Sequence, residues 1–291
     1  MALESMQEIF DKIEKTQKPF WRVILETDMD EREVTEADSM ARMRYTWKAM
    51  LESVDSYQGD RRSVSGLVGG DGKKMRDHAA GMETLCGPYL REVIATALSV
   101  GESNACMCKI VAAPTAGACG VLPAVMVPLY KNGGAEEEEI LKALYVASGI
   151  GAVIAFQACI AGAAGGCQAE IGSASAMAAG ALTALRGGDA AQIGNAVAMA
   201  LKNLMGLVCD PIAGLVEVPC VKRNVIGAVN AISCADMALA GITSRVPVDQ
   251  VIDCMGDVGR RMPVEFRETA LGGLAVTPFG QSIKEQMEQR S

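Results

Sequence analysis

Gly206-Leu-Val-Cys-Asp-Pro-Ile-Ala-Gly-Leu-Val-Glu-Val-Pro-Cys220 is the stretch around which the rest of the chain is organised. Its two prolines and its inner glycine interrupt any regular helix, which allows Cys209 and Cys220 to turn toward a common point. A second segment, residues 161–172, is rich in glycine and carries Cys167. We therefore expect the fold to bring these three cysteines together.

The chemistry of such a site depends on how many thiolates it offers. An iron–sulfur cube held by cysteine on all four irons transfers electrons, whereas a cube held by three leaves one iron open to substrate as a Lewis acid. The wide spacing of Cys167, Cys209 and Cys220 does not match compact ferredoxin motifs or CxxC zinc ribbons. Spacing alone therefore indicates a metal only weakly.

Three segments resemble a known family: AAPTAGACGVLP at residues 112–123, GGCQAEIGSASAMAAG at 165–180 and GLVCDPIAGLVEVPCVKRN at 206–224. They closely resemble the alpha subunit of the iron–sulfur-dependent L-serine dehydratases. The resemblance implies that Cys167, Cys209 and Cys220 bind a [4Fe-4S] cluster with one open iron. It also implies L-serine ammonia-lyase activity, which gives pyruvate and ammonia.

The same resemblance implies a partner chain. In the family, a second region or a separate beta subunit carries a Ser-Ser-His-Thr-Gly-Pro type segment, and this sequence contains none. We therefore expect a hetero-oligomer with a beta subunit that acts on L-serine.

A candidate substrate loop lies at Thr115, Ala116 and Gly117. A short apolar run ends at Pro114, and the loop precedes a new helical segment. Backbone N–H groups at a helix start form a natural carboxylate site. An ordinary helix–helix turn explains the same residues, and the resemblance favours the substrate-loop interpretation.

Other functions for the chain stay open. The chain could be a non-catalytic electron-transfer or scaffold subunit, or a related L-cysteine desulfidase. Cys106 and Cys108 form a lone CxC, and His78 is the one histidine. A serine hydrolase is poorly supported because no GxSxG motif is present, and we find no phosphate-binding glycine loop for pyridoxal phosphate.

Composition favours an all-α fold. Half of the 291 residues are hydrophobic but only 4% are aromatic, and alanine-rich stretches of this kind favour closely packed helices over sheets. We expect a single compact domain with the cluster cysteines on loops or helix ends. Residues 1–37 are predicted to form an N-terminal helical arm, and residues 38–291 the catalytic domain of the alpha type.

Apolar periodicity predicts individual helices. We expect helices at 90–105, 192–207 and 248–255, and one from about 39 to 54 with Asp38 or Ser39 as its N-cap. The stretch between Lys142 and Glu170 carries no charge. Its many alanines and glycines favour a buried central helix over a membrane span.

The net charge of −8 disfavours a nucleic-acid partner, because such binding depends on neutralising phosphates with Lys and Arg. No apolar signal segment opens the sequence, and ten cysteines without such a segment indicate free thiols in a reducing compartment. The expected location is the cytoplasm.

Overall fold

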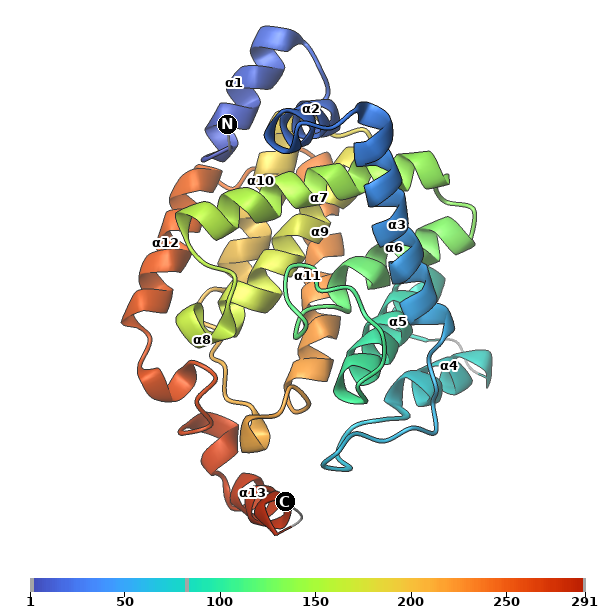
Figure 1. The fold of residues 1–291 in the computed structure, drawn as a ribbon, viewed down its shortest axis with the longest axis vertical. Coiled ribbons are helices and arrows are strands. Elements are labelled where there is room, and N and C mark those ends of the chain that lie inside the picture. The colour runs from blue at the N-terminus through green and yellow to red at the C-terminus, as the bar shows by residue number, and fades with distance from the viewer. Residues whose placement is uncertain (1–2, 82–83, 290–291) are drawn as a thin grey trace.

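Thirteen α-helices make up the computed structural model, which describes residues 3–81 and 84–289 (Figure 1). No β-strand occurs among these residues, and one isolated backbone bridge pairs Cys209 with Arg267. The predicted all-α class with a single packed unit is confirmed.

Four helices rich in small residues form the centre: α7 (Glu137–Gln157), α9 (Ser173–Leu185), α10 (Ala190–Leu204) and α11 (Cys220–Leu239). In Figure 1, α7 lies across the others. Small residues allow close approach, since a Cβ added to Gly180 of α9 would lie 2.3 Å from Ile150 Cδ1 of α7.

The charge-free stretch forms a buried helix, as predicted. Helix α7 is long and apolar enough to cross a membrane by length and composition alone, but most of its residues are buried inside the structure. Tyr145, near its middle, is 2% exposed and hydrogen-bonds Ser39 at 2.6 Å. Packing against α2, α3 and α9 therefore accounts for its apolar composition.

The remaining helices surround this centre, with α1 and α13 at opposite ends of the molecule (Figure 1). They are α1 (Met6–Thr16), α2 (Phe20–Arg32), α3 (Glu36–Asp55), α4 (Asp71–Gly81), α5 (Gly87–Ala105), α6 (Val121–Lys131), α8 (Gly162–Gly165), α12 (Val248–Arg261) and α13 (Pro278–Glu288). Met6 and Phe20 are buried in the same core as the central helices. The division at residue 37 stays a prediction.

The predicted N-cap of α3 is wrong. The helix begins at Glu36 and is capped by Thr35, whose hydroxyl accepts a hydrogen bond from the N–H of Asp38. The carboxylate of Asp38 in turn accepts a hydrogen bond from the N–H of Thr35, so Asp38 occupies the third helical position of a capping box. Ser39, the other candidate, is buried inside the helix.

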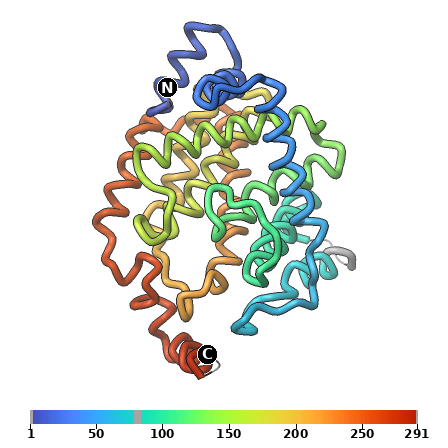
Figure 2. The backbone as a smooth tube through the Cα atoms, in the orientation of Figure 1, coloured from blue at the N-terminus to red at the C-terminus, as the bar shows by residue number. Residues whose placement is uncertain are grey.

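The C-terminal segment runs back along the loop that follows α10 (Figure 2). The N–H of Cys209 donates to the carbonyl of Phe266 at 2.8 Å, and the N–H of Glu268 donates to the carbonyl of Cys209 at 2.9 Å. Helix α12 extends beyond the predicted end at residue 255 to Arg261. The longer helix delivers the chain to this contact.

Candidate metal and substrate site

Cys167 lies directly before a π-helical turn, Gln168–Gly172, that continues into α9. Gly166 before it has φ +76, and a Cβ there would lie 2.6 Å from Met262 Sδ, so the position requires glycine. Single π-turns inside helices are frequent at functional sites. The extra residue in the turn gives Cys167 and its neighbours an orientation that a regular helix would not.

Gln168 joins the Cys167 turn to the loop of Cys209. Its backbone N–H donates to the carbonyl of Leu207 at 2.9 Å, and its side-chain oxygen accepts from the N–H of Gly206 at 2.8 Å. The side chain is 1% exposed, so these bonds are shielded from water. The two cysteine segments are thereby held together.

Arg223, on the first turn of α11, fixes the loop of Cys209 from the other side. Its guanidinium donates to the carbonyl of Val208 at 2.7 Å and to the carboxylate of Asp210 at 2.8 Å. Both side chains of this ion pair are nearly buried. The loop is thus tied to the helix that begins with Cys220.

Cys220 is the first residue of α11, and Asn224 lies one turn later. The buried amide of Asn224 donates to the carbonyls of Cys220, at 3.0 Å, and Gly117, at 2.8 Å. Its oxygen accepts from the N–H of Gly120 at 2.8 Å. Asn224 therefore places the predicted substrate loop against the start of α11.

Two of the three predicted cysteines, Cys167 and Cys209, lie together, and the third lies near them. The sulfurs of Cys167 and Cys209 and a carboxylate oxygen of Glu170 all lie within 4.8 Å of one another. Cys220 lies outside that group of three but is buried close enough for the charge of Cys167 to act on it. The cysteines are 1%, 1% and 6% exposed, and none forms a disulfide.

The thiols differ in acidity. Hydrogen bonding from Cys209 lowers the pKa of Cys167 against the effect of burial, and the positive charge of Arg223 lowers it further. The same hydrogen bond, together with burial, raises the pKa of Cys209. Burial and then the charge of Cys167 raise the pKa of Cys220 to about 12. Cys167 is therefore the thiol most readily deprotonated.

Glu170 lies between the cysteines and the substrate loop. A Cβ on Gly117 would be 3.2 Å from its carboxylate, and a Cβ on Gly162 would be 2.8 Å from it. Burial raises the pKa of the Glu170 carboxyl, the nearby Thr115 hydroxyl lowers it, and the charge of Glu268 raises it. Two carboxylates therefore face the same small space.

The predicted substrate loop has free donors. Thr115 is half-buried, Ala116 exposed and Gly117 buried. Within the described residues, the backbone N–H groups of 115–118 make no hydrogen bond, and the buried hydroxyl of Thr115 has no well-formed one. Helix α6 begins only at Val121, so these donors belong to the loop and not to the helix end.

Known proteins match most of the chain. A model of the family described as serine dehydratase alpha chain matches residues 15–275. The chain belongs to this family. It is 42% identical to the probable L-serine dehydratase alpha chain of Bacillus subtilis, over 91% of this chain and 88% of that protein. It is 52% identical to the corresponding protein of Latilactobacillus sakei, over 67% and 94% of the two chains. It is 40% identical to the L-serine dehydratase alpha chain of Peptoniphilus asaccharolyticus, over 97% of each chain.

The other candidates in this family member stand outside the group of Cys167, Cys209 and Glu170. Cys119 and Cys234 are fully buried in the helical interior, and Cys108 contacts Arg61 at 3.3 Å. His78 is exposed on α4. Ser63 and Ser65, in the segment between α3 and α4, donate to the buried carboxylate of Glu217, three residues before Cys220.

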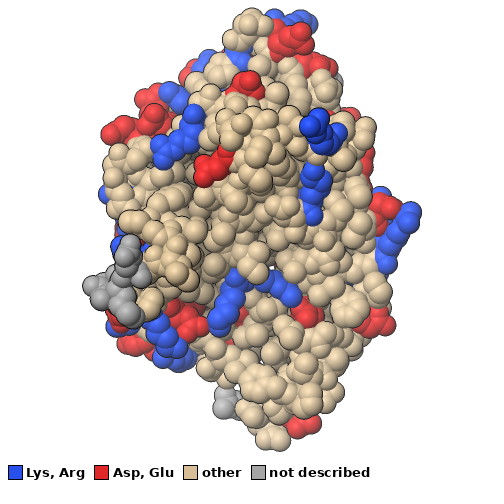
Figure 3. All heavy atoms as spheres, turned by 180° about the vertical axis from the view of Figure 1, so that it is seen from behind, with Lys and Arg blue, Asp and Glu red and all other residues tan. Residues whose placement is uncertain are grey.

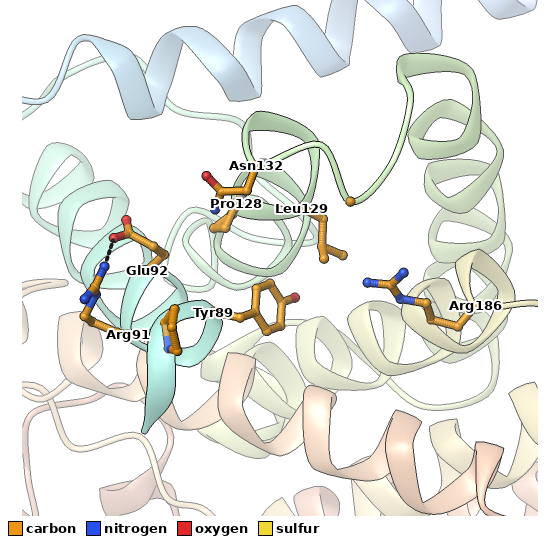
Figure 4. A pocket seen from close by; sticks show the side chains of 9 residues that line it. Tyr89, Arg91, Glu92, Pro128, Leu129, Asn132 and Arg186 are labelled. Atoms are coloured by element: carbon orange, nitrogen blue, oxygen red, sulfur yellow. Dashed lines mark hydrogen bonds and ion pairs between the residues drawn. The ribbon is translucent and has the colours of Figure 1, made fainter. Parts of the chain in front are cut away.

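A cavity of about 550 Å³ lies between α5, α6 and the end of α9 (Figure 4). Tyr89, Leu129 and Arg186 point into it, and Arg91 pairs with Glu92 at its edge. No cysteine lines it. This cavity is therefore separate from the group of Cys167, Cys209 and Glu170.

Sequence reasoning missed four residues of the site: Glu170, Arg223, Asn224 and Glu268. One signal was available, because Glu170 is the sole charged residue between Lys142 and Arg186. A lone charge in so apolar a stretch indicates a functional position. The other three stand in ordinary surroundings in the sequence, and only the packing of α11 and the C-terminal segment reveals them.

Proposed function

We propose that this chain is the alpha subunit of an enzyme that converts L-serine to pyruvate and ammonia with a [4Fe-4S] cluster and a beta subunit. The observation that carries the proposal is the group of buried Cys167 and Cys209 with Glu170, with the buried Cys220 near it and a loop with free N–H groups beside it. Family membership and the names of the relatives support the substrate.

Cys167, Cys209 and Cys220 would hold the cluster. They fit such a group because all three are free thiols shielded from solvent, and thiolates suit soft metal centres. Arg223 lies against Cys167 and offsets part of the negative charge that three thiolates bring. When bound, the cluster supplies a Lewis-acidic iron that stabilises negative charge on the departing hydroxide.

The chain's own residues bind and orient the substrate. The free N–H groups of Thr115, Ala116 and Gly117 would take the serine carboxylate, since successive backbone N–H groups form anion-binding concavities. Asn224 keeps this loop in place against Cys220. Prior orientation of this kind lowers the entropic part of the barrier.

A beta subunit would cover the surface next to the cysteines. Large apolar side chains are exposed along the C-terminal segment that contacts the Cys209 loop; they are Val264, Leu271, Leu274, Val276 and Phe279. Contiguous exposed apolar residues mark interaction surfaces. The relatives are themselves named alpha chains. We propose a hetero-oligomer, located in the cytoplasm because its thiols are free.

Neither a nucleic acid nor a membrane is proposed as a partner. On the face that Figure 3 shows, the described basic and acidic side chains are scattered singly or in small groups, without an extended basic area. Binding to a polyanion depends on such an area.

The test is to purify the chain without oxygen, alone and with its beta subunit, and to measure pyruvate formed from L-serine. We expect a brown preparation that turns over serine when both chains are present, loses activity in air and recovers it with iron and thiol. A stable cluster without turnover would favour the electron-transfer subunit. Faster turnover of L-cysteine, with release of sulfide, would favour the desulfidase.

A further inference from the structure

We propose that Glu170 and Glu268 bind the ammonium group of the substrate. The inference rests on the proposed function and deepens it, because it assigns the residues that select a 2-amino acid at the cysteine site. L-Serine carries an ammonium, a carboxylate and a hydroxyl. The loop at 115–117 offers N–H donors for the carboxylate and has no anionic side chain for the ammonium.

The two carboxylates meet at one point of the structure. A Cβ built on Gly162 would lie 2.8 Å from Oε2 of Glu170 and 3.2 Å from Oε2 of Glu268. Glu170 comes from the π-helical turn after Cys167, and Glu268 from the segment that bridges to Cys209. The absence of a side chain at Gly162 leaves the oxygens accessible to each other and to a small group between them.

No cation of the described residues pairs with either carboxylate. Arg223 is engaged with Asp210, and Arg267, although adjacent in sequence to Glu268, forms no ion pair with either glutamate. Two partly buried carboxylates that face each other without a cation repel, and an arriving ammonium group removes that repulsion. The hydroxyl of Thr115, buried and without a well-formed hydrogen bond, lies beside Glu170 and offers the substrate a further polar contact.

The position suits the reacting molecule. Glu170 lies against Gly117 of the loop and within 4.8 Å of the sulfurs of Cys167 and Cys209. A substrate whose carboxylate lies on the loop therefore has its α-ammonium within reach of Glu170. A 3-hydroxy acid without the amino group would keep the loop contact and lose the glutamate contacts.

The experiment compares Glu170→Gln and Glu268→Gln with the unaltered complex of both chains, prepared anaerobically. For each protein we would measure iron content, kcat and KM for L-serine, and the dissociation constants of L-serine and 3-hydroxypropanoate by calorimetry. A charge-assisted hydrogen bond corresponds to a loss of about 10- to 100-fold in affinity. In Glu170→Gln we expect KM and the dissociation constant for L-serine to rise by this factor. In Glu268→Gln we expect a smaller rise. Iron content, kcat and 3-hydroxypropanoate binding should be unchanged in both variants. The exposed Glu265→Gln is the control and should alter none of these.

Three outcomes would overturn the inference. Loss of iron in Glu170→Gln would make the carboxylate a metal ligand. A fall in kcat at constant KM would assign it to proton transfer. Equal weakening of L-serine and 3-hydroxypropanoate would show that it does not recognise the ammonium. Failure of the proposed function is distinguishable, because the unaltered complex would then form no pyruvate from L-serine.

Discussion

Buried cysteines occur in two regions of this molecule, and their surroundings differ. Cys119 and Cys234 lie in the helical interior, where burial raises their pKa values to about 12 and about 11. Cys167 is equally buried, yet its pKa is lowered because Cys209 donates a hydrogen bond to it and Arg223 adds a positive charge. Burial alone therefore raises the pKa of a thiol, whereas a hydrogen-bond donor and a nearby cation lower the pKa of the buried Cys167.

The two regions are also held together by different forces. The interior relies on small residues that let helices approach, as at Gly180 against Ile150. The site relies on backbone and side-chain hydrogen bonds from Gln168, Arg223 and Asn224 that join separate loops. Substitutions in the interior should therefore change mainly the stability of the fold, whereas substitutions in the site should also change the iron content.

The largest effect is expected from serine replacements of Cys167, Cys209 and Cys220, one at a time. Each should lose the brown chromophore, the iron and the activity, because a serine oxygen is a poor substitute for thiolate. Iron and labile sulfide per chain, measured anaerobically, check this.

Cys119→Ser and Cys234→Ser are the matched controls. They should keep the iron at a cost in stability from a buried hydroxyl. A full cluster in a variant of Cys167, Cys209 or Cys220 would remove that residue from the site and weaken the comparison.

Much of the fold follows from local pattern. Helix α10 and the start of α12 lie where apolar spacing predicts them, and the charge-free stretch forms the buried α7. These features depend on periodicity or composition within one segment. The N-cap of α3 was missed because Asp38 suits both the cap and the third position of a capping box, and the sequence does not distinguish the two.

The site is only partly visible in the sequence. The cysteines were found through a resemblance, since their spacing fits no compact motif. Glu268 lies at the site because the C-terminal segment bridges to Cys209. Asn224 lies there because α11 carries it toward Gly117. Contacts between segments this far apart depend on tertiary packing, which single-sequence patterns do not encode.

The second largest effect is expected from Arg223→Met. It leaves Asp210 buried without its cation, and breaking a buried pair in this way costs about 3–5 kcal/mol. Urea unfolding of the purified chain measures the loss. Iron content should fall as well, because the loop of Cys209 loses its tie to α11.

Arg44→Met is the control for Arg223→Met, since the Arg44–Glu137 pair is exposed. It should cost about 0–1 kcal/mol. Similar losses of unfolding free energy in the two variants would mean that the Arg223–Asp210 pair stabilises the fold no more than an exposed ion pair does.

A smaller effect is expected from Gly180→Ala in the interior. The added methyl would lie 2.3 Å from Ile150 and 3.1 Å from Val197, and overpacking of this kind costs about 1–3 kcal/mol. Iron content should stay full. In Gly172→Ala the nearest atom is 3.9 Å away, so that variant should unfold at nearly the same urea concentration as the parent. Loss of iron in Gly180→Ala would show that the interior and the site are coupled.

The smallest effect is expected at the far end of the helix that leads to Cys209. Asp189 caps α10 through a reciprocal capping box with Gln192, and its carboxylate accepts the N–H of Gln192 at 2.8 Å. Asp189→Ala should cost about 1 kcal/mol, whereas Asp189→Asn should retain the cap and most of the stability.

Helix α10 ends at Leu204, and the loop beyond it is fixed by Gln168 and Arg223 at points that do not involve the cap. Fraying of the first turn should therefore leave iron content and serine turnover unchanged. Urea unfolding and an iron assay on the same samples test both halves of this prediction. A loss of iron that follows the loss of stability would mean that α10 transmits strain to Cys209, and the separation between a packed interior and a hydrogen-bonded site would then fail.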